Sequence, residues 1–488
     1  MPKPISAGLP APASAGKQQF GLIGMDVMGQ SLALNVESKG FSVAVFNRTG
    51  EKTKKFIEQR CRGRNVLGTY DLKEFVAALE TPRRIMLMVK AGDPVDSFIQ
   101  MLKPLLEKGD IIIDGGNSYF KDTQRRCDAL EQEGFRYIGT GVSGGEEGAL
   151  LGPSIMPGGS KEAYDHVGPI LQKIAAQTED GPCCAYMGPG GAGHYVKTVH
   201  NGIEYGIMQL IAETYDIMSQ ALKMKPRDQQ KIFAKWNDGE HGGYLMEITR
   251  DILGVTDEAT GKPLVDLIVD TAGQKGTGKW TTQESLDIGY PIPTIDAALE
   301  ARIISAYKKE RVAAAKILKG KKGRFAGDPK KLVRALGDAL LASMITSYAQ
   351  GMGMLRVASA EYKYDLNLGE IARIWKGGCI IRSKLLTPIR KACVRKPDLI
   401  NIMLDKYFAE RLAKAQANWR FAVGTAVSLG IPCIAMSTSL AYYDSYRRDR
   451  LPANMIQAQR DYFGAHTYGR IDKEGAFHTE WSRLAKGE

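Results

Sequence analysis

The sequence lacks any uninterrupted apolar run of the roughly 18 to 20 residues that a membrane-spanning helix needs. Its first 17 residues, rich in Pro, Ala, Ser and Gly, also lack the apolar core of a secretory signal. Seven cysteines spread over 488 residues are no disulfide framework, and the close pair Cys183 and Cys184 has the wrong spacing for a metal clip. We therefore expect a cytoplasmic protein with reduced thiols, no membrane partner and a flexible segment at residues 1–17.

Neither disorder nor a fibrous repeat fits the composition, because 44% of the residues are hydrophobic and 25% are charged, as in globular proteins. At roughly 100 to 200 residues per domain, the length predicts two to four domains. The net charge of +12 admits an anionic partner. Residues 308–334, however, carry eleven Lys or Arg against two acids, and such a run is typical of a solvated helix face or loop. We expect no nucleic-acid partner.

The order of apolar runs predicts a doubly wound α/β, Rossmann-like domain at residues 18–192. Its candidate strands are residues 20–25, 43–47, 85–89, 111–114 and 137–142. After residue 192, long helical patterns predict a large all-α domain at 193–440. Aligning Trp236 with Trp375 also aligns Gly239 with Gly378, so we expect this domain to be duplicated, with both tryptophans in cores. Residues 441–488, rich in Tyr and Arg, look like a tail that packs on another surface.

A glycine-rich turn, GMDVMG at residues 24–29, follows the first predicted strand and precedes a predicted helix at 30–38. This is the context of a dinucleotide-binding turn. The second strand leads into Arg48, 19 residues after Gly29, where an acid would hold the 2′-hydroxyl of NAD and an Arg accommodates the 2′-phosphate of NADP. The pattern therefore favours NADP. The alternative is an ordinary strand-turn-helix with a surface Arg.

Asp26 departs from this pattern, because it stands where a second glycine normally lets the backbone approach the pyrophosphate. A carboxylate about 5 Å from that group costs roughly 3 kcal/mol at an effective dielectric near 20, before salt screening. Either the side chain turns away or cofactor affinity suffers. We expect replacement of Asp26 by Ala to tighten NADP binding.

Residues 194–222 form one long helical pattern that places Lys197, Asn201 and Glu204 on one stripe. His200 and Tyr205 flank that stripe. Because the rest of the pattern is apolar nearly all round, we expect a buried helix whose polar stripe is interior or lines a cleft. Burial shifts the pKa of a Lys down and that of a Glu up, which suits acid-base catalysis. The alternative is a structural ion pair between Lys197 and Glu204.

Several long motifs resemble those of the decarboxylating 6-phosphogluconate dehydrogenase family, from about residue 19 to about 481. The motifs are FNRT at 46–49, DGGNS at 114–118, GVSGGEEG at 141–148, KTVHNGIEY at 197–205, GQKGTGKW at 273–280 and QRDYFGAH at 459–466. The resemblance implies NADP-dependent oxidative decarboxylation of 6-phospho-D-gluconate to D-ribulose 5-phosphate, CO2 and NADPH, in the pentose phosphate pathway. It also implies a homodimer in which the C-terminal tail supplies Arg460 and His466 to the partner's active site.

The resemblance further assigns residues to each part of the site. The implied cofactor contacts are Gly24, Met25, Asp26, Val27, Met28, Gly29, Asn47, Arg48, Thr49, Val89, Lys90, Ala91 and Asn117. The implied substrate contacts are Asn117, Ser143, Gly144, Gly145, His200, Asn201, Tyr205, Lys275, Arg302, Arg460 and His466. Lys197 would be the catalytic base and Glu204 the acid, and no metal is needed because a cationic Lys polarises the carbonyl.

Two rival interpretations stay open at this point. A related β-hydroxyacid dehydrogenase would carry a similar Lys-bearing helix but would not need the cations Lys275, Arg302 and Arg460 for a substrate phosphate. A non-catalytic protein that binds NADP or a polyanion is suggested by Asp26 and by the basic segment at 308–334. Turnover of 6-phosphogluconate to NADPH and CO2 separates both from the main interpretation.

Overall fold

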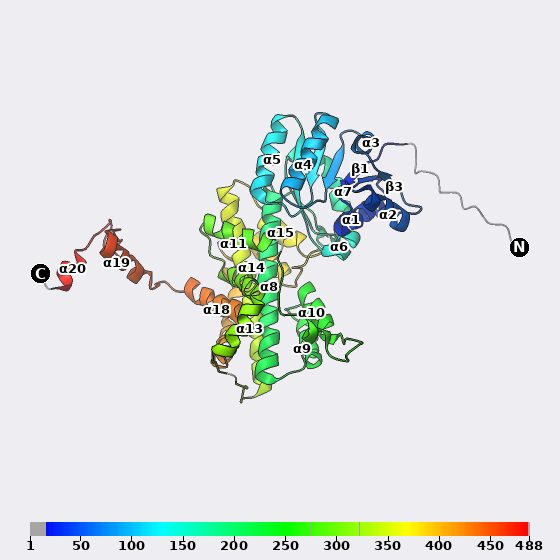
Figure 1. Cartoon of the computed structure of the whole chain (residues 1–488). Coiled ribbons are helices and arrows are strands. Elements are labelled where there is room, and N and C mark those ends of the chain that lie inside the picture. Colours follow the sequence, from blue (N-terminus) through cyan, green and yellow to red (C-terminus); the bar gives the residue numbers. More distant parts are fainter. Residues whose placement is uncertain (1–15, 275, 322, 487–488) are drawn as a thin grey trace. The chain divides into compact units, whose positions relative to one another are not determined.

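The structure is a computed structural model and describes residues 16–274, 276–321 and 323–486 (Figure 1). The chain divides into two compact units, one ending at Ser439 and the other beginning at Leu440. Most of the flexible segment predicted at 1–17 lies outside the described residues. No helix in the described ranges is long and apolar enough to cross a membrane.

A twisted sheet forms the first part of the chain and confirms the predicted Rossmann-like fold. Its strands are β1 (Phe20–Ile23), β2 (Val43–Phe46), β3 (Val66–Thr69), β4 (Arg84–Leu87), β5 (Ile111–Asp114), β6 (Arg136–Val142) and β7 (Ile155–Gly159). Among the described residues they pair in the order β3-β2-β1-β4-β5-β6-β7. The strands from β1 to β6 are parallel, whereas β7 pairs antiparallel with β6. Strand order reverses beside β1, and ligands of such sheets bind at that point, outside the carboxyl ends of the strands.

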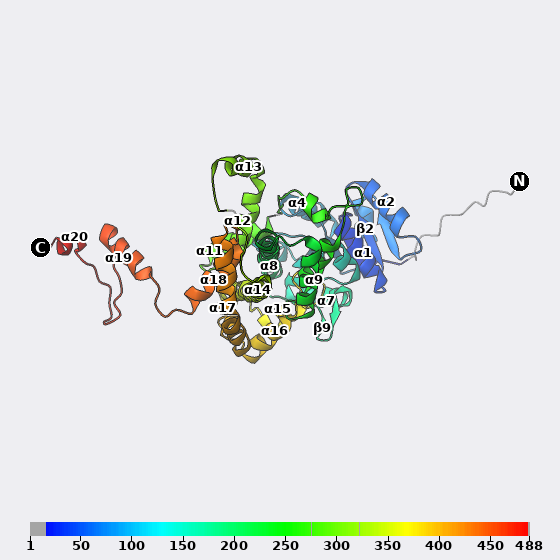
Figure 2. The same ribbon diagram turned by 90° about the horizontal axis from the view of Figure 1, so that it is seen from below.

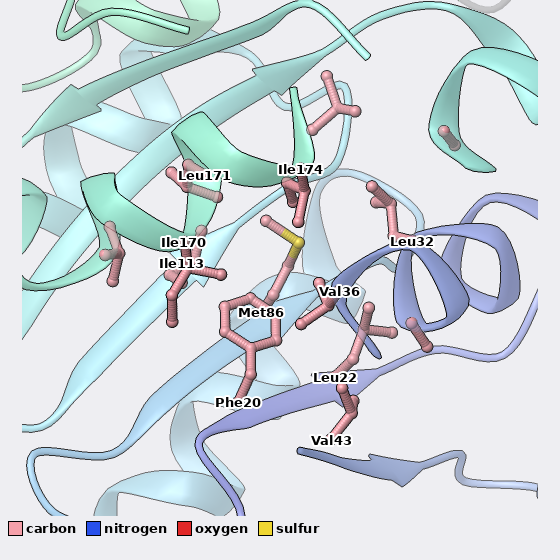
Figure 3. Packing of buried hydrophobic residues seen from close by; sticks show 14 of the residues in the cluster. Phe20, Leu22, Leu32, Val36, Val43, Met86, Ile113, Ile170, Leu171 and Ile174 are labelled. Carbon is pink, nitrogen blue, oxygen red and sulfur yellow. The ribbon is translucent and has the colours of Figure 1, made fainter. Parts of the chain in front are cut away.

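Helices cover both faces of the sheet. They are α1 (Val27–Ser38), α2 (Gly50–Arg60), α3 (Leu72–Ala77), α4 (Asp93–Leu102), α5 (Phe120–Gln132), α6 (Gly145–Leu151) and α7 (Lys161–Ile174), with a 3-10 turn, η1 (Lys103–Leu105). Alternate strand residues point to opposite faces. Phe20 and Leu22 pack with α1 and α7, as Figure 3 shows, whereas Ile23 packs in the cluster that includes α3, α4 and α5. Burial on both faces explains why these strands read as continuous apolar runs.

Two strands, β3 and β7, are absent from the sequence-based prediction. The edge strand β3 contains Gly68, where an added Cβ would lie 2.7 Å from the Ile57 side chain. β7 contains Pro157, and a proline normally argues against a strand except at a sheet edge, where β7 lies. β3 packs against α2 and β7 pairs with β6. Neither interaction is visible as local propensity in the sequence.

Helices make up the rest of the first unit, apart from the small hairpin β8 (Gln177–Thr178) and β9 (Gly181–Pro182) that precedes them. They are α8 (Ala192–Leu222), α9 (Pro226–Asp238), α10 (Tyr244–Gly254), η2 (Leu264–Leu267), α11 (Thr277–Asp287), α12 (Pro293–Ala306), α13 (Lys308–Ile317), α14 (Pro329–Glu361), α15 (Leu368–Ile374), α16 (Leu386–Arg395), η3 (Ile402–Leu404), α17 (Lys406–Ser428) and the first part of α18 (Ile434–Tyr446), which continues into the second unit. In α13, which the structure describes throughout, no residue is buried, as expected of a solvated basic face.

The long helix α8 connects the two parts of the first unit. It contacts β6 and β7 of the sheet and also α11, α12 and α14 of the helical part. Figure 2, which looks along α8, shows α12 and α14 beside it. Most of its residues are buried, as its nearly all-round apolar pattern predicts.

The helical part shows a similar order of elements after each of its two longest helices. Trp236 lies near the end of α9, which follows α8, and Trp375 caps α15, which follows α14. Trp375 is fully buried, whereas Trp236 is only partly buried, stacked on His241. This order supports the predicted duplication, which stays a prediction, as do the domain boundaries at residues 192 and 440.

The second unit contains α19 (Ala453–Gly464) and α20 (Trp481–Ala485), with a single antiparallel bridge between Tyr468 and Phe477. The stretch between the two helices, together with Trp481 of α20, folds back on α19 through hydrogen bonds to Asp461 and Gln457. The predicted tail is therefore a small folded hook with internal contacts of its own.

Glu213 of α8 should contribute strongly to stability. Its carboxylate, 3% exposed, accepts hydrogen bonds of 2.8 and 2.9 Å from the backbone N–H groups of Ala435 and Met436, at the start of α18. We expect Glu213→Ala to lower the free energy of unfolding by about 2 to 4 kcal/mol, since each buried N–H left without an acceptor costs roughly 1 to 3 kcal/mol. Urea denaturation measures this. Glu300→Ala, at an exposed position of α12, is the control, and equal losses in the two variants would contradict the prediction.

Candidate active site

The first half of α8 lies directly on strand β6 because glycine allows a close approach. A Cβ added at Gly141 would lie 2.5 Å from the Lys197 Cβ, so any larger residue in this part of β6 would push α8 away. Ser143 follows the carboxyl end of the same strand. The fold thus brings the 141–148 and 197–205 motifs together.

Lys197 lies at the centre of a buried polar chain on α8. Its Nζ donates a hydrogen bond of 2.7 Å to Asn201 Oδ1 and lies 3.3 Å from His200 Nδ1. The other ring nitrogen, His200 Nε2, lies 3.2 Å from Ser143 Oγ. All four side chains are buried, Lys197 being only 6% exposed. The predicted stripe is therefore interior.

Burial changes the protonation of this chain. It lowers the pKa of Lys197 below the usual 10.5, against the opposing effect of the Glu204 and Cys379 charges. Burial and then the Lys197 charge hold the pKa of His200 well below 6.5, so His200 is neutral at physiological pH. Lys197 can therefore exist as a neutral amine, the form in which it can accept a proton.

Glu204 lies two helical turns after Lys197 on the same side of α8. Burial raises its pKa above 4.5, opposed by the charges of Lys197 and then Arg302. Its Oε2 is 3.9 Å from His200 Nδ1. On this one helix face, burial thus lowers the pKa of Lys197 and raises that of Glu204. Lys197 and Glu204 do not form the simple ion pair of the alternative interpretation.

Tyr205 of α8 contacts Arg302 of the neighbouring helix α12. The Arg302 guanidinium of α12 stacks at 3.5 Å from the centroid of the Tyr205 ring and donates to the carbonyl of Gly273. This places a cation and a hydroxyl side by side near Glu204, a pairing suited to an anionic group. Arg302 is partly buried in this position rather than fully exposed.

The loop after β6 depends on a contact that sequence reasoning missed. Gly144 and Gly145 have φ values of 108° and 63°, which favour glycine, and a Cβ at Gly144 would meet the Gly378 carbonyl at 2.7 Å. Trp375, three residues before Gly378, packs edge-on against His200 with ring centroids 5.6 Å apart. Assigning Trp375 to a core is right, but that core also covers the site. No local sequence signal links Trp375 to His200.

The glycine-rich turn has the tight geometry expected of a dinucleotide site. Gly24 has φ 105°, and a Cβ at Gly29 would lie 1.9 Å from the Gly24 carbonyl oxygen. The Met25 N–H donates to Asn47 Oδ1 at 3.0 Å, which ties the turn to the end of β2. The α1 helix begins at Val27 and includes Met28, three residues earlier than predicted. These residues fit a dinucleotide phosphate, because α1 directs its free N–H groups at the turn.

Asp26 turns toward α2 and forms an ion pair. Its carboxylate lies 2.5 Å from Lys52 Nζ, and the two side chains are 79% and 50% exposed respectively. Arg48 is exposed at the end of β2, four residues before Lys52. Lys52 was not among the predicted site residues, although its place in the first turn after Thr49 could have indicated it.

Other predicted residues share the same edge of the sheet. Val89 and Ala91, partly buried, and the exposed Lys90 follow β4, and the exposed Asn117 follows β5. The hydrogen bonds of Asp114 to the Ser118 hydroxyl and the Gly116 N–H shape the loop that carries Asn117. The carboxyl ends of parallel strands meet at one edge, so these loops converge.

Three predicted substrate residues are not placed with this cluster. Lys275 lies outside the described residues. Arg460 and His466 are exposed in the second unit, on the 453–486 hook. Among the described residues, no group of three or more His, Cys, Asp or Glu side chains could hold a metal ion.

The geometry therefore joins two functions along α8 and the sheet edge. One is a turn at the carboxyl end of β1 that is suited to a phosphate, and the other is a buried amine with a carboxyl group two turns away. A neutral amine can take a proton from a hydroxyl group, and a protonated carboxyl can return one to carbon. This arrangement is suited to oxidation of a hydroxy acid by a nicotinamide dinucleotide.

Comparisons with known proteins agree with this chemistry. The NAD binding domain of 6-phosphogluconate dehydrogenase matches residues 19–188, and the C-terminal domain of 6-phosphogluconate dehydrogenase matches residues 193–481. The NADP(+)-dependent, decarboxylating 6-phosphogluconate dehydrogenase of Bacillus subtilis is 57% identical over 96% of this chain and 100% of its own length. The decarboxylating enzyme of Escherichia coli is 55% identical over 95% of this chain and 99% of its own.

A solved structure shows the same architecture. The Plasmodium falciparum 6-phosphogluconate dehydrogenase, described in apo form and in complexes with NADP+ and with 6-phosphogluconate, is 45% identical to this chain. Its TM-score is 0.92, and the match covers 95% of this chain and 100% of that one. The chain belongs to the family of decarboxylating 6-phosphogluconate dehydrogenases.

Proposed function

We propose that Lys197 is the base and Glu204 the acid in the reaction of this chain. The chain is an NADP-dependent oxidoreductase that converts 6-phospho-D-gluconate to D-ribulose 5-phosphate, CO2 and NADPH. The observation that carries the assignment is the buried hydrogen bond of Lys197 to Asn201, with Glu204 two turns along the same face. Burial moves the pKa of Lys197 down and that of Glu204 up, toward the pH at which both can exchange protons.

The first step is oxidation of the substrate at C3, for which NADP supplies the hydride acceptor. Neutral Lys197 takes the proton of the 3-hydroxyl as the hydride leaves C3. Asn201 holds the Lys197 amine in place through the 2.7 Å hydrogen bond, and neutral His200 adds no charge that would repel the ammonium formed. The substrate becomes a 3-keto acid.

Decarboxylation follows because the carboxylate is β to the new ketone. Its electrons flow into the carbonyl as CO2 leaves, and protonated Lys197 stabilises the enediol oxygen. Glu204 then donates its proton to the carbon that lost the carboxylate, which becomes C1 of ribulose 5-phosphate. At the end of the reaction Lys197 is protonated and Glu204 is ionised. Both residues exchange protons with solvent before the next turnover.

The substrate is held, in this proposal, by groups on both sides of Lys197. Those near the reacting carbons are Asn117, Ser143, Gly144, Gly145, His200 and Asn201. The phosphate is met by Tyr205, Lys275, Arg302 and Arg460, with His466 beside it. The stacking of Arg302 on Tyr205 supports this division, since it places a guanidinium and a hydroxyl where a phosphate could accept from both.

NADP is held by the turn at residues 24–29 and by the loops after β2, β4 and β5. The proposed contacts are Gly24, Met25, Asp26, Val27, Met28, Gly29, Asn47, Arg48, Thr49, Val89, Lys90, Ala91 and Asn117. The absence of Cβ atoms at Gly24 and Gly29 and the exposed Arg48 support the fit of the pyrophosphate and the 2′-phosphate.

We also infer a homodimer in which the hook of one chain, with Arg460 and His466, completes the partner's site. Large apolar side chains exposed on the hook support this assembly, because a partner surface would cover them. They are Met455, Ile456, Tyr462, Phe463, Ile471 and Leu484. A cytoplasmic location is part of the same proposal, and the seven cysteines, all buried free thiols, suit a reducing compartment.

Lys197→Ala and Glu204→Ala should fail at different steps. We expect Lys197→Ala to lower the rate of NADPH formation by about 10² to 10⁴-fold, the usual contribution of a positioned base. Glu204→Ala should slow product formation and remove the stereochemical control of protonation, because the acid delivers its proton to one face. Turnover in D2O, with NMR of the product, shows whether deuterium enters C1 on one face or on both.

Lys231→Ala is the matched control, since Lys231 is exposed on α9, next to α8 in the chain, and should behave as wild type. Substantial oxidation by Lys197→Ala would remove Lys197 as the base. Deuterium on a single face in Glu204→Ala would remove Glu204 as the acid.

Asp26→Ala should tighten NADP binding, because it removes a carboxylate beside the pyrophosphate turn and releases Lys52 from its ion pair. The expected gain is about twofold to fivefold in Kd, since exposed charge interactions contribute roughly 0.2 to 1 kcal/mol, and it should shrink as salt is added. Titration calorimetry at two ionic strengths measures it. The control is Glu58→Ala, which removes an exposed acid of α2 six residues after Lys52. Equal Kd values for wild type and Asp26→Ala would refute the idea.

Supply of Arg460 in trans can be tested by subunit mixing. At a substrate concentration near the wild-type KM, Lys197→Ala and Arg460→Ala homodimers should each be nearly inactive. A mixed dimer would contain one site with both wild-type residues and one site with both substitutions, so random exchange should restore about a quarter of wild-type activity. Denaturing and refolding a mixture, followed by a turnover assay, measures this. If Arg460 served its own chain's site, the mixture would stay as inactive as its components.

A further inference from the structure

The hook of the second unit contains a fully buried carboxylate. Asp461 on α19 is 0% exposed, although Arg460 and Tyr462 on either side of it are exposed. Carboxylates are rarely buried without a specific set of donors. Asp461 is the only buried charged residue among the described residues 453–486. The hook itself supplies the donors for its carboxylate.

Four donors surround the two oxygens of Asp461. Oδ1 accepts from the Thr467 N–H at 3.0 Å and lies 2.9 Å from His478 Nδ1. Oδ2 accepts from the Thr479 N–H at 3.0 Å and from the indole Nε1–H of Trp481 at 2.7 Å. Burial opposes ionisation, but the hydrogen bonds from His478, Trp481 and Thr479 outweigh it and lower the pKa of Asp461 to about 2. One carboxylate thus ties α19 to both following stretches of the hook.

The loop held by Asp461 has a strained backbone. Ala465 and Thr467 both adopt a positive φ, 49° and 56°, which residues other than glycine rarely do. The Ala465 N–H bonds to the Asp461 carbonyl at 2.9 Å, and the Thr467 N–H bonds to its side chain. His466 lies between these two residues with an exposed side chain. Strain of this kind persists only where surrounding contacts enforce it, and here Asp461 provides two of them.

Arg460 is tied to the same loop through Gln457. The Arg460 Nη1–H donates to Gln457 Oε1 at 3.0 Å, and Gln457 Nε2 donates to the Thr467 carbonyl at 2.5 Å. Thr467 is therefore held on its N–H by Asp461 and on its carbonyl by Gln457. The orientation of Arg460 and that of the His466 loop are set by one connected network.

We propose that Asp461 is a positioning residue for substrate binding, which fixes Arg460 and His466 in the arrangement that receives the phosphate end of 6-phosphogluconate. The inference rests on the proposed function, in which these two side chains meet the substrate. Asp461 itself faces the interior of the hook and touches neither substrate nor cofactor. Its removal should therefore weaken binding of the substrate and leave NADP binding unchanged.

The test uses the full-length chain with Asp461→Asn, which keeps the size of the side chain but turns one acceptor oxygen into a donor amide that faces two N–H groups. We expect KM for 6-phosphogluconate to rise about tenfold or more, with KM for NADP unchanged. The control is Asp472→Asn, the same change at an exposed carboxylate of the hook that pairs with Arg470, and it should behave as wild type. Sedimentation at the assay concentration checks that the assembly is unaltered.

A double-mutant cycle separates positioning from a general loss of structure. In a chain that already carries Arg460→Ala and His466→Ala, Asp461→Asn should change KM for 6-phosphogluconate by less than about twofold, because the residues through which it acts are gone. If Asp461→Asn does not yield folded protein, Gln457→Leu, at a less buried site, breaks the link between Arg460 and Thr467 and should raise the same KM.

The proposal is overturned if Asp461→Asn leaves KM for 6-phosphogluconate unchanged. It is also overturned if Asp461→Asn raises that KM by the same factor in the Arg460→Ala, His466→Ala background as in the wild type, or if a changed oligomeric state accounts for the loss. In the Gln457→Leu arm, an unchanged KM has the same meaning. Absence of turnover by the wild-type chain would instead overturn the proposed function, and it is observed before any variant is compared.

Discussion

The hydrogen bond from Lys197 to Asn201 depends on almost every larger feature of the fold. It can form in the interior only because α8 lies against β6, where Gly141 leaves room for the Lys197 stem. The burial that lowers the pKa of Lys197 follows from the packing of α8 against the sheet and against α11, α12 and α14. The same helix then carries Glu204 into a partly buried position. A single packed helix thus supplies two groups with opposite pKa shifts.

Glycine controls how closely the parts of the site approach. At the turn after β1, the backbone of Gly24 nearly touches the position that a Cβ on Gly29 would occupy, which leaves the start of α1 open to an anion. At Gly144 the close neighbour is the carbonyl of Gly378, from the helical part of the chain. The helical part therefore shapes the loop that follows β6. The proposed cofactor and substrate contacts are therefore joined by backbone packing rather than by long side chains.

Much of the fold follows from patterns along the chain, and the failures have definite causes. Residues 111–114 form a strand because both faces of the sheet bury them, and this burial produces the apolar run that predicted it. β3 and β7 have no such run, since Gly68 and Pro157 interrupt them and tertiary pairing forms the strands. The sequence offered turning away of the Asp26 side chain as one of two outcomes, but it did not predict the partner Lys52, because the ion pair joins segments that follow different strands.

The sequence by itself determined the family, the Rossmann turn and the polar stripe of α8, and it predicted a 2′-phosphate contact at Arg48, because each depends on residue types at a fixed local spacing. Only the tertiary structure decided that Trp375 covers His200, that Asp26 turns toward Lys52 and that Asp461 is enclosed by its own hook. Those contacts join residues that lie up to 175 positions apart in the chain. Local periodicity carries no information on such pairs, since they form only when separate elements pack together.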